Sequence, residues 1–228
     1  MSATASGCYP FRSAQARDRY LEHYDAWARS WPAGSETRIV RTDAGETLVR
    51  IDGPSDAPPL VLLPPSGCNS LLWIPDIKTY SKDYRTYAVD AIYDNGRSVD
   101  SRPVKSAASA VAWLDGLFDI LGLVDGINIL GQSMGGYVTA EYLLHAPRRV
   151  AKAIILGPPG VSVATSGGFA ARVLYMLIPS RMTYRAFVRG SCLSLQPLPR
   201  ATGSSLPCWT TSWTTWCWPR SVSSERRS

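Results

Sequence analysis

The sequence is poor in histidine and has no paired set of cysteines. It contains two histidines in 228 residues, and its five cysteines show no spacing typical of metal ligands. This pattern argues against a metal centre and, because the cysteine count is odd, against a disulfide framework. We therefore predict no metal and no cofactor. Unpaired cysteines are typical of a reducing compartment, so we expect a cytoplasmic location.

Long apolar segments are also absent. Residues 1–20 contain no hydrophobic stretch of the kind that a signal peptide needs. Residues 153–171 carry no charge, but residues 157–160 read Gly-Pro-Pro-Gly, and prolines inside a span would break a helix. We predict no membrane span. Instead we expect a buried strand at 153–156, followed by a loop and the start of a helix.

An excess of basic charge is missing from the part of the chain that precedes Tyr142. The whole sequence has a net charge of +6, which by itself would suggest a nucleic-acid partner. From Tyr142 onward, however, there are 11 basic residues and one acidic residue, against 13 basic and 17 acidic residues before it. The basic excess belongs to one end of the chain, and we predict no nucleic-acid partner.

What the sequence does contain is an alternation of apolar runs with helical patterns. Apolar runs at 60–63, 86–89 and 127–130 predict strands, and the period of an amphipathic helix occurs at 12–30 and 106–121. The first of the runs is preceded by a predicted β-hairpin, because two strand-like segments flank an Asp-Ala-Gly turn. We expect an α/β fold with a mostly parallel sheet, in which ligands bind beyond the carboxyl ends of the strands. Three polar residues would lie at that edge: Ser66, Asp94 and Ser133.

The stretch at 127–137 reads INILGQSMGGY and has the order of strand, small-residue turn and helix. A helical segment at 138–144 follows and ends before a proline. A serine at a sharp strand-to-helix turn is the arrangement of a nucleophile elbow, and Gly131 and Gly135 would leave space for the close backbone contacts of this turn. The first N–H groups of the helix would point above Ser133. The alternative is an ordinary surface turn that carries a serine, but the flanking strand and helix favour the elbow.

Several other motifs accompany this stretch along the chain. They are Gly-Glu-Thr at 45–47, Pro-Pro-Leu-Val-Leu-Leu at 58–63, Trp-Ile-Pro at 73–75, Tyr-Ala-Val-Asp at 87–90 with Gly-Arg-Ser at 96–98, and Ala-Pro-Arg-Arg-Val at 146–150. Together with the elbow, these motifs resemble the α/β-hydrolase superfamily, in particular its bacterial carboxylesterase-like members. The resemblance extends from the N-terminal helix to about Arg189.

This resemblance implies roles for individual residues. Ser133 would be the nucleophile of a serine hydrolase that cleaves carboxylic esters through an acyl-enzyme, and a small ester or acyl compound would be its substrate. The backbone N–H of Met134 would be one donor of the oxyanion hole. The other donor comes from the loop after the strand at 60–63, where two prolines without an N–H precede Ser66, which is therefore the candidate. The resemblance leaves the substrate's identity and the oligomeric state open.

The acid and the histidine base that this family places after the nucleophile have no matching residues here. After Ser133 the sequence has two acidic residues, Glu141 and Glu225, and one histidine, His145. His145 lies on the elbow's own helix, about 18 Å from Ser133 at the helical rise per residue, so it cannot be the base. We therefore expect ester turnover to be impaired. The alternative is a non-catalytic remnant that binds small ligands.

The expected organisation has four parts. These are an N-terminal helical segment (1–34), an α/β-hydrolase core (35–160), the start of a helical cap (161–189) and an aberrant tail (190–228). In the tail the apolar periodicity stops, and serine, proline, arginine, cysteine and tryptophan dominate. A basic, aromatic segment for nucleic acid or membrane is one interpretation. We favour disordered, out-of-frame sequence, because the tail stands where the last strands, the acid and the base should be, and we predict that a neighbouring reading frame encodes them.

Overall fold

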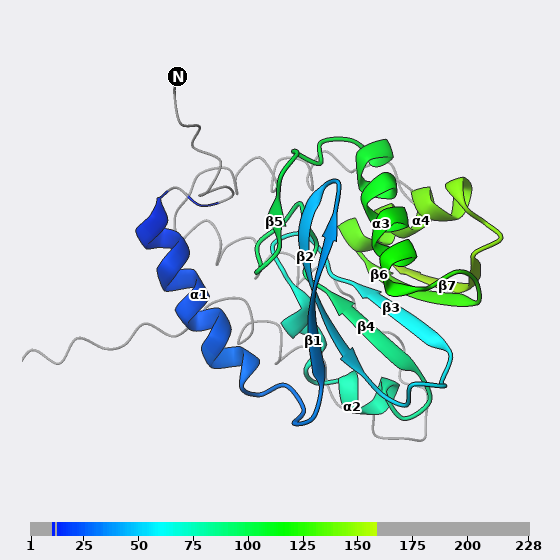
Figure 1. Ribbon diagram of the computed structural model, residues 1–228, viewed down its shortest axis with the longest axis horizontal. Coiled ribbons are helices and arrows are strands. Elements are labelled where there is room, and N and C mark those ends of the chain that lie inside the picture. The colour runs from blue at the N-terminus through cyan, green and yellow to red at the C-terminus, as the bar shows by residue number, and fades with distance from the viewer. Residues whose placement is uncertain (1–10, 12, 159–228) are drawn as a thin grey trace, which may run out of the picture. The chain divides into compact units, whose positions relative to one another are not determined.

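The computed structural model describes residue 11 and residues 13–158. The predictions for the cap (161–189) and for the tail (190–228) therefore lie outside the described residues. The described part consists of one sheet with helices on both of its faces (Figure 1). No helix in this part is long and apolar enough to cross a membrane.

The sheet has seven strands and is parallel in its centre. Its strand order is β1-β2-β4-β3-β6-β7, and β5 pairs with β2. The β3, β4, β6 and β7 strands run parallel, whereas the β1–β2 hairpin and β5 are antiparallel to their neighbours. The mostly parallel sheet predicted from the sequence is thus confirmed. The bounds are β1 Glu36–Thr42, β2 Gly45–Asp52, β3 Pro59–Leu63, β4 Arg85–Val89, β5 Val99–Asp100, β6 Ile127–Gln132 and β7 Val150–Leu156.

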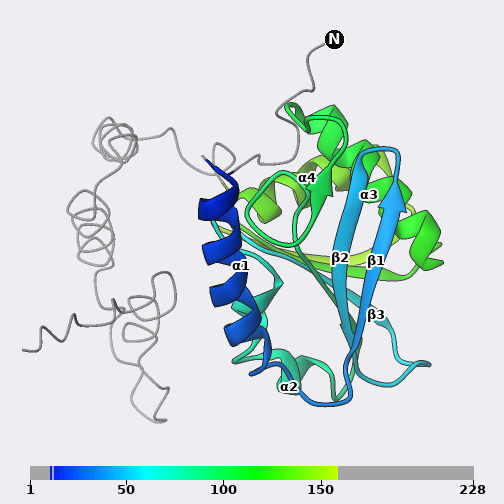
Figure 2. The ribbon, with the colours of Figure 1, turned by 60° about the vertical axis from the view of Figure 1, so that its left-hand side comes forward.

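Both faces of the sheet are covered, and β3 shows why its sequence is apolar throughout. Val61 and Leu63 point into a core formed with α3 (Ala107–Leu121) and α4 (Met134–His145). Leu60 and Leu62 point into a second core, formed with α1 (Ala14–Ala28), the 3-10 turn η1 (Ser70–Trp73) and α2 (Ile77–Tyr80). Figure 2 shows α1 and the α3–α4 pair on opposite sides of the sheet. A strand that is buried on both faces cannot alternate with polar residues.

The helix α3 has clear start and stop signals. The hydroxyl of Ser106 accepts from the N–H of Ser109, and the hydroxyl of Ser109 accepts from the N–H of Ser106, which makes a reciprocal cap. Gly122 ends the helix at φ +73°, a left-handed conformation that glycine adopts without strain. The apolar stripe predicted at 106–121 is buried against the sheet. The predicted helix at 12–30 is also present, over the shorter range of α1.

The prediction of a buried strand at 153–156 is wrong in one respect. The strand is present as β7, but Ile154 and Leu156 are 53% and 46% exposed. The physical reason is that β7 pairs with β6 on one side and, within the described residues, with no strand on the other. An edge strand can carry apolar residues without burying them, and the sequence pattern alone does not distinguish the two cases.

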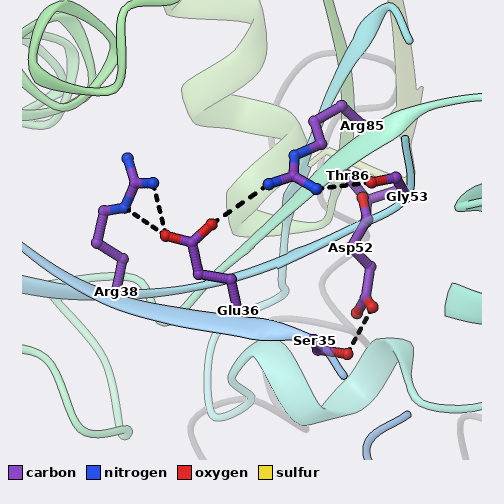
Figure 3. A network of polar contacts seen from close by, with 7 residues as sticks. All are labelled: Ser35, Glu36, Arg38, Asp52, Gly53, Arg85 and Thr86. Atoms are coloured by element: carbon purple, nitrogen blue, oxygen red, sulfur yellow. Dashed lines mark hydrogen bonds and ion pairs between the residues drawn. The ribbon is translucent and has the colours of Figure 1, made fainter. Parts of the chain in front are cut away.

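Ion pairs gather at the amino ends of the parallel strands (Figure 3). The guanidinium of Arg85 donates to the carbonyl of Gly53 at 2.6 Å and to the carboxylate of Glu36 at 3.3 Å. Glu36 also pairs with Arg38 at 2.6 Å. The carboxylate of Asp52 accepts from the hydroxyl of Ser35 nearby. We call the edge of the sheet that carries these residues the amino edge, and its members are Ser35, Glu36, Arg38, Asp52 and Arg85.

Candidate active site

Ser133 lies between β6 and α4, at the carboxyl edge of the sheet. Its backbone has φ 50° and ψ −114°, and it is the one non-glycine residue with positive φ in the described part of the chain. Its N–H donates to the carbonyl of Leu156 on β7 at 2.7 Å, and its carbonyl accepts from the N–H of Tyr137 at 2.9 Å. The strand and the helix thus hold Ser133 in a strained conformation, which is commonly found at functional positions.

The two elbow glycines stand where no side chain fits. A Cβ on Gly135 would lie 2.4 Å from the carbonyl oxygen of Leu63 and 2.7 Å from that of Pro64. A Cβ on Gly131 would lie 2.3 Å from the hydroxyl of Thr139 and 2.4 Å from the carbonyl oxygen of Gly135. That hydroxyl donates to the same carbonyl at 2.7 Å. The spacing of the glycines therefore lets the start of α4 approach both β6 and the loop after β3.

Met134 and Ser66 belong to the two segments that this close approach brings together. Met134 is the first residue of α4, so its N–H has no acceptor within the helix. Ser66 lies in the loop after β3, is exposed, and its N–H has no hydrogen-bond partner among the described residues. Two backbone donors therefore stay available on adjoining segments. Their role as an oxyanion hole remains a prediction.

The loop after β3 is held by three residues from two other segments, the stretch after β4 and the helix α1. The N–H of Gly67 donates to the carboxylate of Asp94 at 2.8 Å, and the N–H of Ser70 donates to that of Asp90 at 2.9 Å. The side-chain amide of Asn69 donates to the hydroxyl of Tyr20 on α1 at 2.8 Å. The prediction that Asp94 lies at the same edge as Ser66 is thus confirmed by a hydrogen bond to the neighbour of Ser66.

Asp90 is the buried centre of this edge. Its side chain is fully buried and accepts from the hydroxyl of Tyr24 and from the N–H of Arg97, both at 2.8 Å, as well as from Ser70. The pKa of Tyr24 is raised, first by burial and then by the negative charge of Asp90, so the phenol stays protonated and donates. A Cβ on Gly96 would lie 2.7 Å from this carboxylate. The sequence analysis found Asp90, Gly96 and Arg97 as parts of one motif but missed that Asp90 also binds Tyr24 and Ser70.

Comparison with known proteins now identifies the family. The profile of a family described as "alpha/beta hydrolase fold" matches residues 58–189. The chain belongs to this family. The matched segment contains the elbow, the loop after β3 and the Asp90 motif.

The relatives of this α/β-hydrolase include bacterial carboxylesterases. It is 36% identical to carboxylesterase YbfK of Bacillus subtilis over 148 residues, which are 65% of this chain and 50% of the relative. It is 39% identical to the uncharacterized carboxylesterase nap of the same organism over 140 residues, 61% of this chain and 46% of the relative. The crystal structure of naproxen esterase from B. subtilis superposes with a TM-score of 0.71 at 33% identity, over 79% of this chain and 62% of that one. The chain thus spans about half the length of the curated relatives it matches.

The acid and the histidine that follow Ser133 in the described part of this α/β-hydrolase both lie on α4. The Nε2 atom of His145, at the last residue of the helix, is 3.9 Å from the carboxylate of Asp115 on α3, and its side chain is 53% exposed. Glu141 hydrogen-bonds the hydroxyl of Tyr137, which raises the pKa of that phenol. Neither residue shares a described contact with Ser133, as the position of His145 on the helix predicts. No group of three metal-ligating side chains occurs among the described residues.

Proposed function

We propose that this α/β-hydrolase cleaves carboxylic esters through an acyl-enzyme on Ser133. The observation that carries the proposal is the strained positive φ of Ser133 at the start of α4, directly after a buried parallel strand. Such a conformation presents a side chain beyond the sheet edge and beside unpaired helical N–H groups. The carboxylesterase relatives support the same activity.

The reaction would use these groups in a fixed order. The Oγ of Ser133 attacks the ester carbonyl, while its proton passes to a base, and the negative charge that develops on the carbonyl oxygen is stabilised by the N–H groups of Met134 and Ser66. The alcohol then leaves with a proton, and an acyl-serine remains. Water attacks this acyl-serine, and the carboxylic acid is released with the serine restored. In this proposal Ser133 would be the nucleophile and the N–H groups of Met134 and Ser66 the two donors. We propose that turnover is impaired, because no acid and no histidine of this chain match the positions that the family uses for its acid and its base.

The two candidate N–H donors at this edge favour hydrolysis over a simple binding role. Both candidate donors are uncharged N–H groups without a described partner, and such donors stabilise a transient oxyanion more than a neutral ligand. The second candidate function is a non-catalytic protein that binds small acyl compounds. This alternative is favoured if the serine does not react. Without a base, only substrate binding and the oxyanion hole would accelerate the reaction, by about 10³–10⁴-fold over the reaction in water in a well-studied case.

A covalent labelling experiment separates these functions. The purified chain is treated with an alkyl fluorophosphonate, and the labelled residue is identified by mass spectrometry of the peptides. Because the base is missing, we expect slow labelling of Ser133, no label on Ser133→Ala, and the same slow labelling in Ser55→Ala, which replaces an exposed serine at the opposite edge. Hydrolysis of short aryl esters and of a naproxen ester, measured on the same three proteins, then shows turnover. Absence of labelling at Ser133 together with binding of acyl compounds would establish the non-catalytic alternative.

We propose a small-molecule ester as the substrate and a cytoplasmic location, the latter because the cysteine pattern fits a reducing compartment. Cell fractionation with an antibody against the chain tests the location. Recovery in a membrane or secreted fraction would refute it.

A further inference from the structure

We infer that Asp94 is a positioning residue that fixes the turn carrying Ser66, and through it one donor of the oxyanion hole. The geometric part of this inference rests on described contacts. Its catalytic part rests on the proposed function. Asp94 lies in the segment after β4, and it reaches the loop after β3 from the neighbouring strand end.

The middle of the turn at Ser66 has little packing to hold it. The N–H of Cys68 donates to the carbonyl of Pro65 at 3.1 Å, and Gly67 has φ +79°, as in a turn that requires glycine at its third position. Ser66 and Gly67 are both exposed, and a Cβ on Gly67 would meet no atom within 4 Å. Pro65 is buried and Cys68 is half-buried, so packing holds the two ends of the turn, whereas the exposed middle depends on its hydrogen bonds.

Asp94 supplies the hydrogen bond that ties the turn to the rest of the edge. One carboxylate oxygen accepts from the N–H of Gly67 at 2.8 Å, and the other accepts from the N–H of Asn95 at 2.7 Å. The backbone N–H of Asp94 donates to the carbonyl of Ala91 at 3.0 Å. The side chain is therefore held at its own loop by one oxygen and holds the neighbouring loop with the other.

This arrangement requires a carboxylate and not simply a polar side chain. Two N–H donors face the two oxygens of Asp94. An asparagine has one acceptor oxygen, and its NH₂ group cannot accept from a backbone N–H. Asp94→Asn can therefore satisfy one of the two donors, and Asp94→Ala can satisfy neither. A graded series of variants follows from the geometry.

Amide hydrogen exchange measured by NMR tests the geometric part directly. We expect the Gly67 amide to exchange about tenfold faster or more in Asp94→Ala, as loss of a hydrogen bond to a charged acceptor implies, and at an intermediate rate in Asp94→Asn. Asp43→Ala is the matched control, because it removes an exposed carboxylate from the β1–β2 turn with the same change of charge. Unchanged exchange of the Gly67 amide in Asp94→Ala would overturn the inference, whatever the activity of the chain.

Kinetics on a short aryl ester test the catalytic part. We expect kcat to fall about tenfold in Asp94→Ala with KM nearly unchanged, because a displaced oxyanion donor weakens the transition state more than the bound substrate. Asp94→Asn should fall between, and Asp43→Ala should match the wild type. A raised KM with unchanged kcat would contradict the positioning role. Failure of the proposed function is seen separately, as absence of fluorophosphonate labelling in the wild type, and the amide exchange then still decides whether Asp94 holds the turn.

Discussion

The two edges of the sheet are stabilised in different ways. At the amino edge, Glu36, Arg38 and Arg85 pair through side chains, and the side chains of Glu36 and Arg38 are 41% and 47% exposed. At the carboxyl edge, the fully buried carboxylate of Asp90 accepts from two backbone N–H groups and a buried phenol. The ion pairs of the amino edge join side chains that water can also solvate, with one further bond from Arg85 to the carbonyl of Gly53, whereas Asp90 at the carboxyl edge binds backbone N–H groups of two loops. A fixed backbone is what the proposed oxyanion hole would require.

The largest expected effect comes from removing the carboxylate of Asp90. Asp90→Ala leaves the N–H groups of Ser70 and Arg97 and the phenol of Tyr24 buried without their acceptor, and we expect a loss of about 3–5 kcal/mol of unfolding free energy. Glu36→Ala at the amino edge should cost about 1 kcal/mol or less, because its pairs are exposed. Urea unfolding of both variants measures the contrast. Equal losses would show that the two edges do not differ as described.

The next effect concerns the close approach at the elbow. Gly135→Ala places a Cβ against the carbonyl oxygens of Leu63 and Pro64, and we expect it to destabilise the fold by about 3 kcal/mol. Gly116→Ala in α3 is the matched control, because its Cβ would lie 3.8 Å from Thr42 without a clash. The higher helix propensity of alanine should raise the unfolding free energy by about 1 kcal/mol. Thermal unfolding of the pair is sufficient. A stabilising Gly135→Ala would disprove the predicted clash.

A smaller effect is expected from the strain at Ser133. Replacement by glycine removes the cost of a positive φ, whereas alanine retains it, so Ser133→Gly should be more stable than Ser133→Ala by about 1 kcal/mol. Both variants lack the hydroxyl, so the comparison isolates the backbone. If the two variants unfold at the same urea concentration, the positive φ carries no cost.

The smallest effect concerns a carboxylate that lacks the donors of Asp90. Asp76 precedes α2 without a side-chain capping bond, and burial raises its pKa above the ordinary value of 3.8. The protonated form therefore favours the fold, and this contribution is present below about pH 4 and is lost as the pH rises through the raised pKa. We expect Asp76→Asn to be slightly more stable than the wild type near pH 7 and equal to it near pH 3. Urea unfolding at both pH values checks this. A stability difference that grows toward low pH would contradict a raised pKa of Asp76.

The sequence predicted the elements well because their apolar periods are strong. The helix α3 and the strand β3 lie where the pattern placed them, since their stripes and caps depend on nearby residues. The role of Asp90 was missed, because its partners Tyr24 and Ser70 are far from it in the sequence and only the fold brings them together. The apolar residues of β7 predicted a buried strand, and its exposure could be expected only from the lack of a strand-like pattern after it. Whether a strand lies at an edge depends on its neighbours and not on its own residues.

At the site, local and distant contributions separate in the same manner. The glycine spacing around Ser133 predicted a tight turn, because the steric requirement involves residues close in sequence. The hydrogen bond from Gly67 to Asp94 could be expected only as proximity at one sheet edge. The direction in which the N–H of Gly67 points depends on the positive φ of this residue. A glycine permits such a φ but does not require it.

The hydrogen bond from Ser133 to Leu156 has a consequence for how the molecule folds. The amide of the serine is satisfied by a strand that appears later in the chain, so the turn after β6 is incomplete until β7 has paired. An unpaired amide at a strained residue is costly, and this cost is removed in the same step that aligns β7 with β6. The elbow and the β6–β7 pairing should therefore form together, as one cooperative unit, and not as a preformed turn to which a strand is added.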